Sequence, residues 1–191
     1  MSTPKDSAIE GERRIVTRVD ASGKSGFHAD TVPPRVDRFQ AIPGMVSSIL
    51  WATAGEPVLA DGVLDPVPGL TSLHPAPGGS VFMTLTVPPD STFASPSFDP
   101  AAAAAEHAQR APGLAERVEA DVPGLFHTTD TLDYVVVLEG SIWLVTDEGE
   151  IRLDRGDTAV QQGTRHAWHN HADVPATIAV VLLGARRSMP T

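Results

Sequence analysis

Short runs of alternating apolar and polar residues recur along most of the chain, and each run stops at a turn signal. The clearest run is Ser80 to Val87, in which every second residue from Val81 onward is apolar. An alternation with a period of two places these side chains on one face of a β-strand. Similar runs predict strands at residues 13–19, 24–31, 47–53, 131–138, 141–146, 150–153, 158–161, 166–170 and 176–183, with a short extended piece at 71–74.

The spacing of these strands predicts the architecture. The run at 176–183 is almost wholly apolar, so we expect it to be a central strand. Six strands joined by tight turns after residue 130 are typical of an antiparallel sandwich or barrel. We expect residues 1–70 to form an N-terminal arm whose strands, beginning with a hairpin, pack on the barrel or on a partner subunit. Residues 71–191 form the barrel itself.

One segment, at about residues 90–122, breaks the strand pattern. Asp99 precedes Pro100 and a run of alanines, which are a helix N-cap, a favoured first helical residue and strong helix formers. The pattern predicts a helix over 99–109 and a second short helix over 114–120. This insertion is either a surface excursion or dimer contact, or a lid over a pocket, and we expect His107 in it to be a solvated helix residue.

Composition and charge narrow the function classes. The 191 residues carry a formal net charge of -10, which argues against a nucleic-acid partner. The chain has no cysteine, so disulfides, thiolate metal sites and cysteine nucleophiles are excluded. Its N-terminal residues lack a signal-like apolar core, and its longest apolar run is too short for a bilayer. We therefore expect a soluble cytoplasmic protein without a membrane partner.

The stretch from Pro123 to Ala185 carries two spaced motifs. In the first, His127 is followed two residues later by Thr129, then by Asp133, and six further residues lead to Gly140. In the second, Gly156 and Gly163 precede His166, and Asn170 follows three residues after it. Together the two motifs resemble those of the cupin family, with Thr129 in the place of a second histidine and Asp133 in the place of a glutamate.

The resemblance implies a fold and a metal. The fold would be all-β, a cupin-type antiparallel β-barrel or jelly roll. A divalent transition metal (Fe, Mn, Ni or Zn) would be held by His127, His166 and Asp133, a donor set that suits such ions. Thr129 is a poor ligand, and Asp130 takes its place if the strand bulges.

Other readings of the same residues stay open. His127 and His166 can equally be hydrogen-bonding pocket residues without a metal, and Asp133 can cap a turn. Trp168, which shares a face with His166, belongs either to the core or to a substrate pocket. We expect the pocket residues to be Thr129, Asp130, Gln161, Arg165 and Trp168, with Arg165 either binding a substrate carboxylate or lying solvated at the rim.

Two further histidines, His169 and His171, should face away from His166, because an odd separation along a strand reverses the face. They form either an ordinary surface pair or a surface metal site.

The leading hypothesis is a metal-dependent cupin enzyme that acts on a small organic molecule as an oxygenase, decarboxylase, dehydratase or isomerase. The alternative is a metal-free cupin that binds a small ligand for sensing or sequestration. A purely structural partner protein is the third reading. Cupins commonly exchange N-terminal strands, so the resemblance also implies a homodimer.

Overall fold

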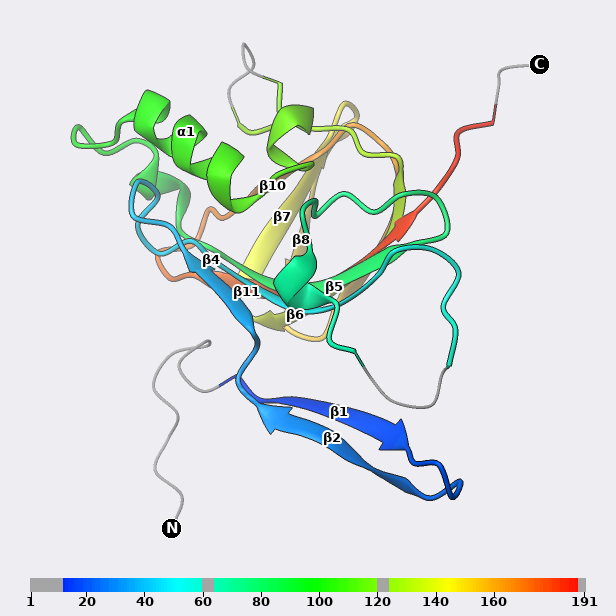
Figure 1. Ribbon diagram of the computed structural model, residues 1–191. Helices are drawn as coiled ribbons and strands as arrows, with labels where there is room; N and C mark the ends of the chain where they lie inside the picture. Colours follow the sequence, from blue (N-terminus) through cyan, green and yellow to red (C-terminus); the bar gives the residue numbers. More distant parts are fainter. Residues whose placement is uncertain (1–11, 60–63, 120–123, 189–191) are drawn as a thin grey trace.

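A computed structural model describes residues 12–59, 64–119 and 124–188 (Figure 1). Its eleven strands confirm the all-β architecture, and every strand pairing is antiparallel. The strands are β1 (Arg14–Val19), β2 (Ser25–Thr31), β3 (Arg35–Arg38), β4 (Val46–Thr53), β5 (Ser80–Val87), β6 (Thr131–Glu139), β7 (Ser141–Thr146), β8 (Gly149–Asp154), β9 (Thr158–Gln162), β10 (Ala167–His169) and β11 (Ala176–Gly184). One α-helix, α1 (Pro100–Arg110), and three 3-10 turns, η1 (Val67–Gly69), η2 (Asp90–Thr92) and η3 (Ala115–Arg117), complete the described elements.

The largest sheet has six strands in the order β3-β4-β5-β11-β6-β9. The last strand in the chain, β11, lies between β5 and β6, which confirms the central position expected from its apolar sequence. A second sheet has the order β10-β7-β8. The short backbone bridge between His127 and His166 connects the segment before β6 to the start of β10.

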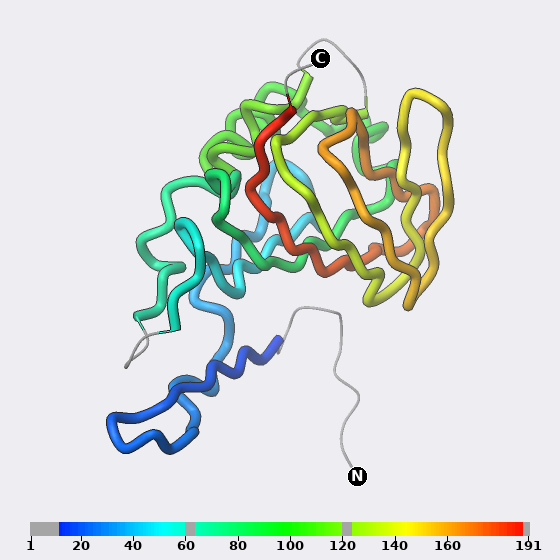
Figure 2. The backbone as a smooth tube through the Cα atoms, turned by 90° about the vertical axis from the view of Figure 1, so that its right-hand side faces the viewer, coloured from blue at the N-terminus to red at the C-terminus, as the bar shows by residue number. Residues whose placement is uncertain are grey.

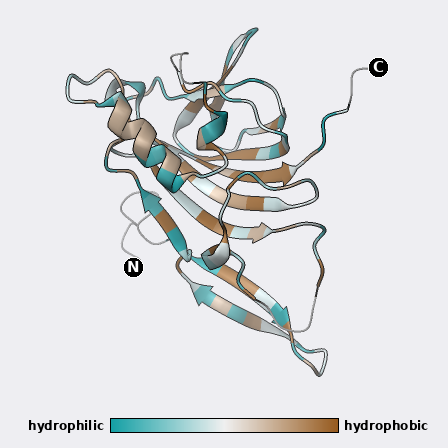
Figure 3. Cartoon of the chain, turned by 45° about the horizontal axis from the view of Figure 1, so that its top comes forward, coloured by the Kyte–Doolittle hydropathy of each residue, from teal (hydrophilic) through white to brown (hydrophobic). Residues whose placement is uncertain are grey.

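The alternation predicted from the sequence appears in the burial of β6. Thr131, Asp133, Val135 and Val137 are buried, whereas the residues between them face outward, with Tyr134 47% exposed. The buried side chains of β5, β6 and β11 form one core with Ile142 of β7. The apolar segments follow these strands, while the β1–β2 hairpin is more polar (Figure 3).

The predicted N-terminal arm divides into two parts. Strands β3 and β4 are hydrogen-bonded into the large sheet, whereas β1 and β2 form a separate hairpin that projects from the barrel (Figure 2). Arg14 ties the base of the hairpin down, because its guanidinium donates to the Leu50 carbonyl and to the Asp65 carboxylate. The sequence missed β3, which directly follows Pro33-Pro34. The homodimer stays a prediction.

The insertion contains the predicted helix. The Asp99 carboxylate accepts hydrogen bonds from the N–H groups of Ala101 and Ala102 and so caps α1 as expected. The Glu106 carboxylate fixes the helix to the barrel, because it accepts hydrogen bonds from the backbone N–H groups of Gln40 and Ala41. The prediction of a second helix is wrong for residues 114–119, because only the single 3-10 turn η3 forms there. Ala120, the last residue of that prediction, lies outside the described residues. No helix among the described residues is long and apolar enough to cross a membrane.

Candidate functional site

A cavity of about 150 Å³ lies between the inner face of the large sheet and the insertion. Strands β4, β5, β6 and β11 supply its floor through mainly apolar side chains: Ser47, Met83, Leu85, Val87, Val135, Ile178, Val180 and Leu182. The insertion covers it with Phe93, His107, Ala111, Leu114 and Val118. The insertion is therefore a wall of this pocket, not a surface excursion.

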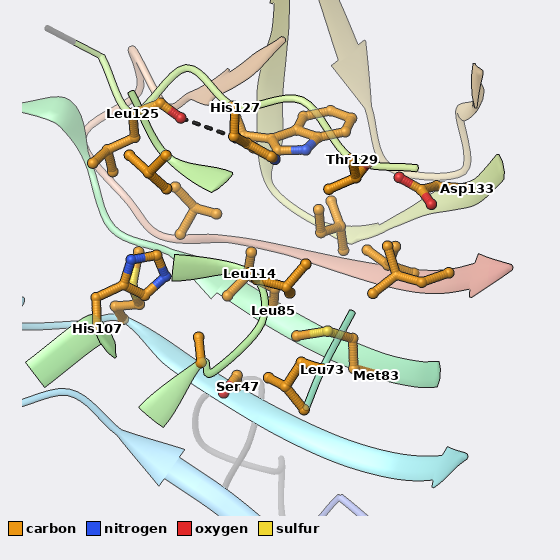
Figure 4. Close-up of a pocket in the computed structure, with 18 of the residues that line it drawn as sticks. Ser47, Leu73, Met83, Leu85, His107, Leu114, Leu125, His127, Thr129 and Asp133 are labelled. Atoms are coloured by element: carbon orange, nitrogen blue, oxygen red, sulfur yellow. Dashed lines mark hydrogen bonds between the residues drawn. The ribbon is translucent and has the colours of Figure 1, made fainter. Parts of the chain in front are cut away.

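His127 and His166, the pocket pair, both line the pocket, and Figure 4 shows His127 in its wall. Their backbones exchange two hydrogen bonds, of 2.9 and 3.0 Å, and their ring centroids are 4.2 Å apart. Each ring is also held through Nδ1, which lies 3.0 Å from the Leu125 carbonyl in His127 and 2.9 Å from the Thr164 carbonyl in His166. A carbonyl only accepts, so each Nδ1 carries the proton and each Nε2 keeps a free lone pair.

Backbone strain accompanies this arrangement. Leu125 has φ 59°, and it is the one non-glycine residue in the described part of the chain with a positive φ. A bulky residue there costs on the order of 1–2 kcal/mol. The strained carbonyl is the one that holds His127 Nδ1, so the strain orients a pocket imidazole.

Burial decides the charge of the pocket pair. It lowers the pKa of His127, and it lowers the pKa of His166 to about 4, with nearby His127 as a second cause. Both rings are therefore neutral at pH 7.

Asp133 is the buried carboxyl group of the pocket. It is 4% exposed, and its Oδ1 has no hydrogen-bond partner among the described residues. Burial raises the pKa of Asp133 to about 6. Gln161 lies directly opposite on β9, and its Nε2 is likewise buried without a partner in the described part of the chain. An unpaired donor and an unpaired acceptor thus lie in register across β6 and β9.

Comparison with known proteins identifies the family. A "Phomopsin biosynthesis cluster protein C'" from Diaporthe leptostromiformis is 33% identical over 168 residues, which cover 83% of this chain and 70% of that protein. A cupin-domain-containing oxidoreductase, virC, from Hypocrea virens is 39% identical over 64 residues, 31% of this chain and 33% of that protein. The chain belongs to the cupin family. No single family model matches this cupin.

A solved cupin structure is similar over most of its length. The Cupin_2 domain of an XRE family transcriptional regulator from Enterobacter cloacae aligns with 75% of this chain and 99% of its own, with a TM-score of 0.39 and 13% identity.

The three predicted metal ligands of this cupin all line one pocket, but they do not converge. Within the described ranges, only one group of three or more His, Asp or Glu residues brings ligand atoms within 4.8 Å of one another, and it is not His127, His166 and Asp133. The buried hydroxyl of Thr129 accepts a hydrogen bond from Thr131, and Thr129 is a poor ligand by its chemistry. The Nε2 atoms of the pocket pair are the nitrogens available to a metal, and no group of three ligands that includes them is assembled among the described residues.

The other predicted pocket residues separate into two groups. Thr129 and Trp168 line the pocket, and the Trp168 ring centroid is 6.0 Å from that of His166. Asp130 and Arg165 do not line it. Asp130 points to the opposite side and binds Arg117 and Arg187, and Arg165 is occupied by Glu119 and Asp147 while its guanidinium stacks on Phe126 at 4.1 Å. Gln161 is buried behind the lining, beside Asp133.

His107 is a pocket residue that the sequence placed in solvent, and this prediction is wrong. Its ring lines the cavity from α1, with its centroid 6.0 Å from that of Phe39 (Figure 4). Burial lowers the pKa of His107. The alanine-rich helix has no strong apolar stripe, so no sequence signal showed which face would cover the barrel.

His169 and His171 lie on the other side of β10, as expected, and they meet an aspartate that the sequence did not suggest. Together with Asp90 of η2 they are the group whose ligand atoms lie within 4.8 Å of one another. Glu150 of β8 contacts His171 as well. We refer to Asp90, His169, His171 and Glu150 as the rim cluster, a His/Asp site able to hold a metal.

Proposed function

We propose that this cupin is an enzyme that binds a small, mainly apolar organic molecule in the barrel pocket and moves a proton with Asp133. The observation that supports this most is the buried, unpaired Oδ1 of Asp133 in an otherwise apolar pocket. An unpaired buried acceptor costs the fold about 1–3 kcal/mol, so a ligand that donates to it would recover that energy.

Asp133 would act as a general base. With a pKa raised to about 6 it is ionised at pH 7, yet it is more basic than an ordinary carboxylate. It would take a proton from a carbon or oxygen of the ligand, and the electron pair of the broken bond would stay on the ligand. Return of the proton at another atom completes an isomerisation, and return to a departing hydroxyl completes a dehydration.

The neighbouring polar groups would orient the ligand. The Nε2 atoms of His127 and His166 are acceptors, so they would bind a ligand O–H or N–H group. Trp168 and the apolar strand residues would hold the rest of the molecule and exclude water.

The test is a screen followed by a comparison of variants. Purified protein is incubated with small enolisable ketones, phenols and hydroxy acids, and binding is followed by native mass spectrometry and turnover by NMR. We expect Asp133→Asn to keep binding and to lose turnover by about 100-fold or more. Ile178→Trp, which fills the cavity, should lose binding. Turnover that survives in Asp133→Asn would exclude the general base.

A metal-dependent reaction is the second candidate, and the locked pocket pair favours it. Both Nδ1 atoms are held by carbonyls, which is the arrangement that presents Nε2 to a metal. A divalent transition metal there would polarise a bound carbonyl or activate dioxygen. The relatives named as cupin-domain-containing oxidoreductases support an oxidative version of this reaction.

Metal analysis distinguishes the candidates. A pocket metal should be present in the purified protein and be lost from His127→Gln/His166→Gln. Binding without turnover, with or without added metal, would instead support the metal-free binding module.

A further inference from the structure

The rim cluster brings together side chains from three separate parts of the chain. Asp90 begins the insertion, Glu150 lies in β8, His169 ends β10, and His171 follows two residues later. The Asp90 Oδ2 atom lies 3.1 Å from His169 Nδ1 and 2.9 Å from His171 Nδ1. Both imidazoles therefore aim the same type of nitrogen at one carboxylate oxygen.

These separations suit a metal ion. A tetrahedral Zn²⁺ with bonds of about 2.0–2.1 Å requires ligand atoms roughly 3.4 Å apart. The two Asp90–histidine separations need to widen by only about half an ångström to admit the ion. Two histidines and one carboxylate also leave a coordination position for water.

Further hydrogen bonds orient the side chains of the cluster. His171 Nε2 lies 3.0 Å from the Glu150 carboxylate, so its other nitrogen is held by an acid while Nδ1 faces Asp90. Metal-binding histidines usually have such a carboxylate partner. The Asn170 N–H donates to Asp90 Oδ1 at 3.0 Å, which fixes the aspartate and leaves Oδ2 directed at the histidines.

The fold restricts His169 in a similar way. Gly124 has φ 99°, and a Cβ at this position would lie 2.9 Å from His169 Nε2. The Nε2 edge of the ring therefore packs against a glycine backbone. Nδ1 is left as the nitrogen that faces the cluster.

We propose that Asp90, His169 and His171 bind a divalent transition metal of the Zn²⁺ type at the barrel rim, with Glu150 as the outer partner of His171. The metal joins the start of the insertion to the end of β10. Two pocket-lining residues are close to the cluster in sequence: Phe93 follows Asp90 by three residues, and Trp168 directly precedes His169. The ion thus holds two walls of the pocket together without entering it.

The experiment measures Zn²⁺ binding to the full chain. Protein stripped with EDTA is titrated with Zn²⁺ against a chromophoric chelator, and Co²⁺ absorption reports the ligand geometry. We expect His169→Gln/His171→Gln to lose one equivalent of Zn²⁺ and its Co²⁺ band. Asp90→Asn should lose the same equivalent, and Glu150→Gln should weaken it about 10- to 100-fold.

Two controls make the result specific. His28→Gln removes an exposed histidine of β2 and should change neither stoichiometry nor affinity. His127→Gln/His166→Gln should keep the rim equivalent, because it alters only the pocket pair.

Undiminished Zn²⁺ binding by Asp90→Asn and by the His169/His171 variant would overturn the proposal. So would loss of the equivalent only from the pocket variant. Circular dichroism in EDTA verifies that each variant is folded. If the double variant does not fold, the conservative Asp90→Asn and Glu150→Gln decide the question.

Discussion

The two histidine clusters of this cupin lie near the two ends of the short strand β10 and differ in their surroundings and in the direction of their pKa shifts. The pocket pair is surrounded by apolar side chains, and burial lowers the pKa of both imidazoles. In the rim cluster, His171 is 41% exposed and faces two carboxylates, and its pKa is raised, chiefly by the hydrogen bond to Glu150. The pKa values of two histidines only five residues apart are therefore shifted in opposite directions, so a histidine motif alone does not define the chemistry.

Asn170, the only asparagine in the chain, lies between His169 and His171 of the rim cluster, and its loss should have the largest effect on stability. Its buried amide donates to the carbonyls of Val87 and Val174. Asn170→Ala leaves both carbonyls without this donor, which should lower the free energy of unfolding by about 4 kcal/mol. Urea denaturation measures this, with the exposed Gln109→Ala as control. A change below about 1 kcal/mol would contradict the anchoring role.

The acid sensitivity of the fold should depend on His166. Its pKa falls from 6.5 to about 4 on folding, so the unfolded chain takes up the proton first and stability decreases as the pH drops from 6.5 to 4. The contribution is about 3 kcal/mol over this range. His166→Gln should flatten that part of the pH–stability curve in urea denaturation, whereas His28→Gln should leave it unchanged. An identical slope in wild type and His166→Gln would disprove this.

Asp133 should act in the opposite direction. Its pKa rises from 3.8 to about 6 on folding, so its contribution to stability decreases as the pH rises from 4 to 6 and is then constant. Between pH 4 and pH 7.5, the free energy of unfolding of Asp133→Asn should therefore rise by up to about 3 kcal/mol relative to that of the wild type. Thermal or urea unfolding at both pH values measures this gain. The exposed Asp173→Asn is the matched control, and a difference that does not vary with pH would show that the carboxyl is not held in a dry site.

Without metal, the rim cluster should make the smallest of these contributions to the stability of the fold. The raised pKa of His171 adds stability below pH 6.5 that is lost as the pH rises through the folded value. Because the pair is exposed, Glu150→Gln should cost only about 0.5 kcal/mol at pH 6 in EDTA, and nothing at pH 9 or in high salt. Glu148→Gln, in the neighbouring turn, is the control. An effect that persists at pH 9 would point to packing rather than charge.

The parts of this molecule that local sequence encodes were predicted well. Alternation gave most of the strands, because one face of each is buried, and the Asp99 cap gave the start of α1. The two motifs brought His127 and His166 to one pocket. The contact of Asp90 with His169 could not be predicted, because the two residues are 79 positions apart and no local sequence pattern links them. Two further features depend on tertiary packing alone. One is the face of α1 that carries His107, and the other is the set of ion pairs that keep Asp130 and Arg165 out of the pocket.

The position of β11 has a consequence for how the protein is made. β5 and β6 are neighbours only through β11, and β11 leaves the ribosome after all the other described strands. While it is still in the exit tunnel, the inner edges of β5 and β6 remain unpaired and attractive to other chains. We therefore expect the barrel to close only once β11 has emerged, and nascent chains to depend on protection until residue 184 is outside the tunnel.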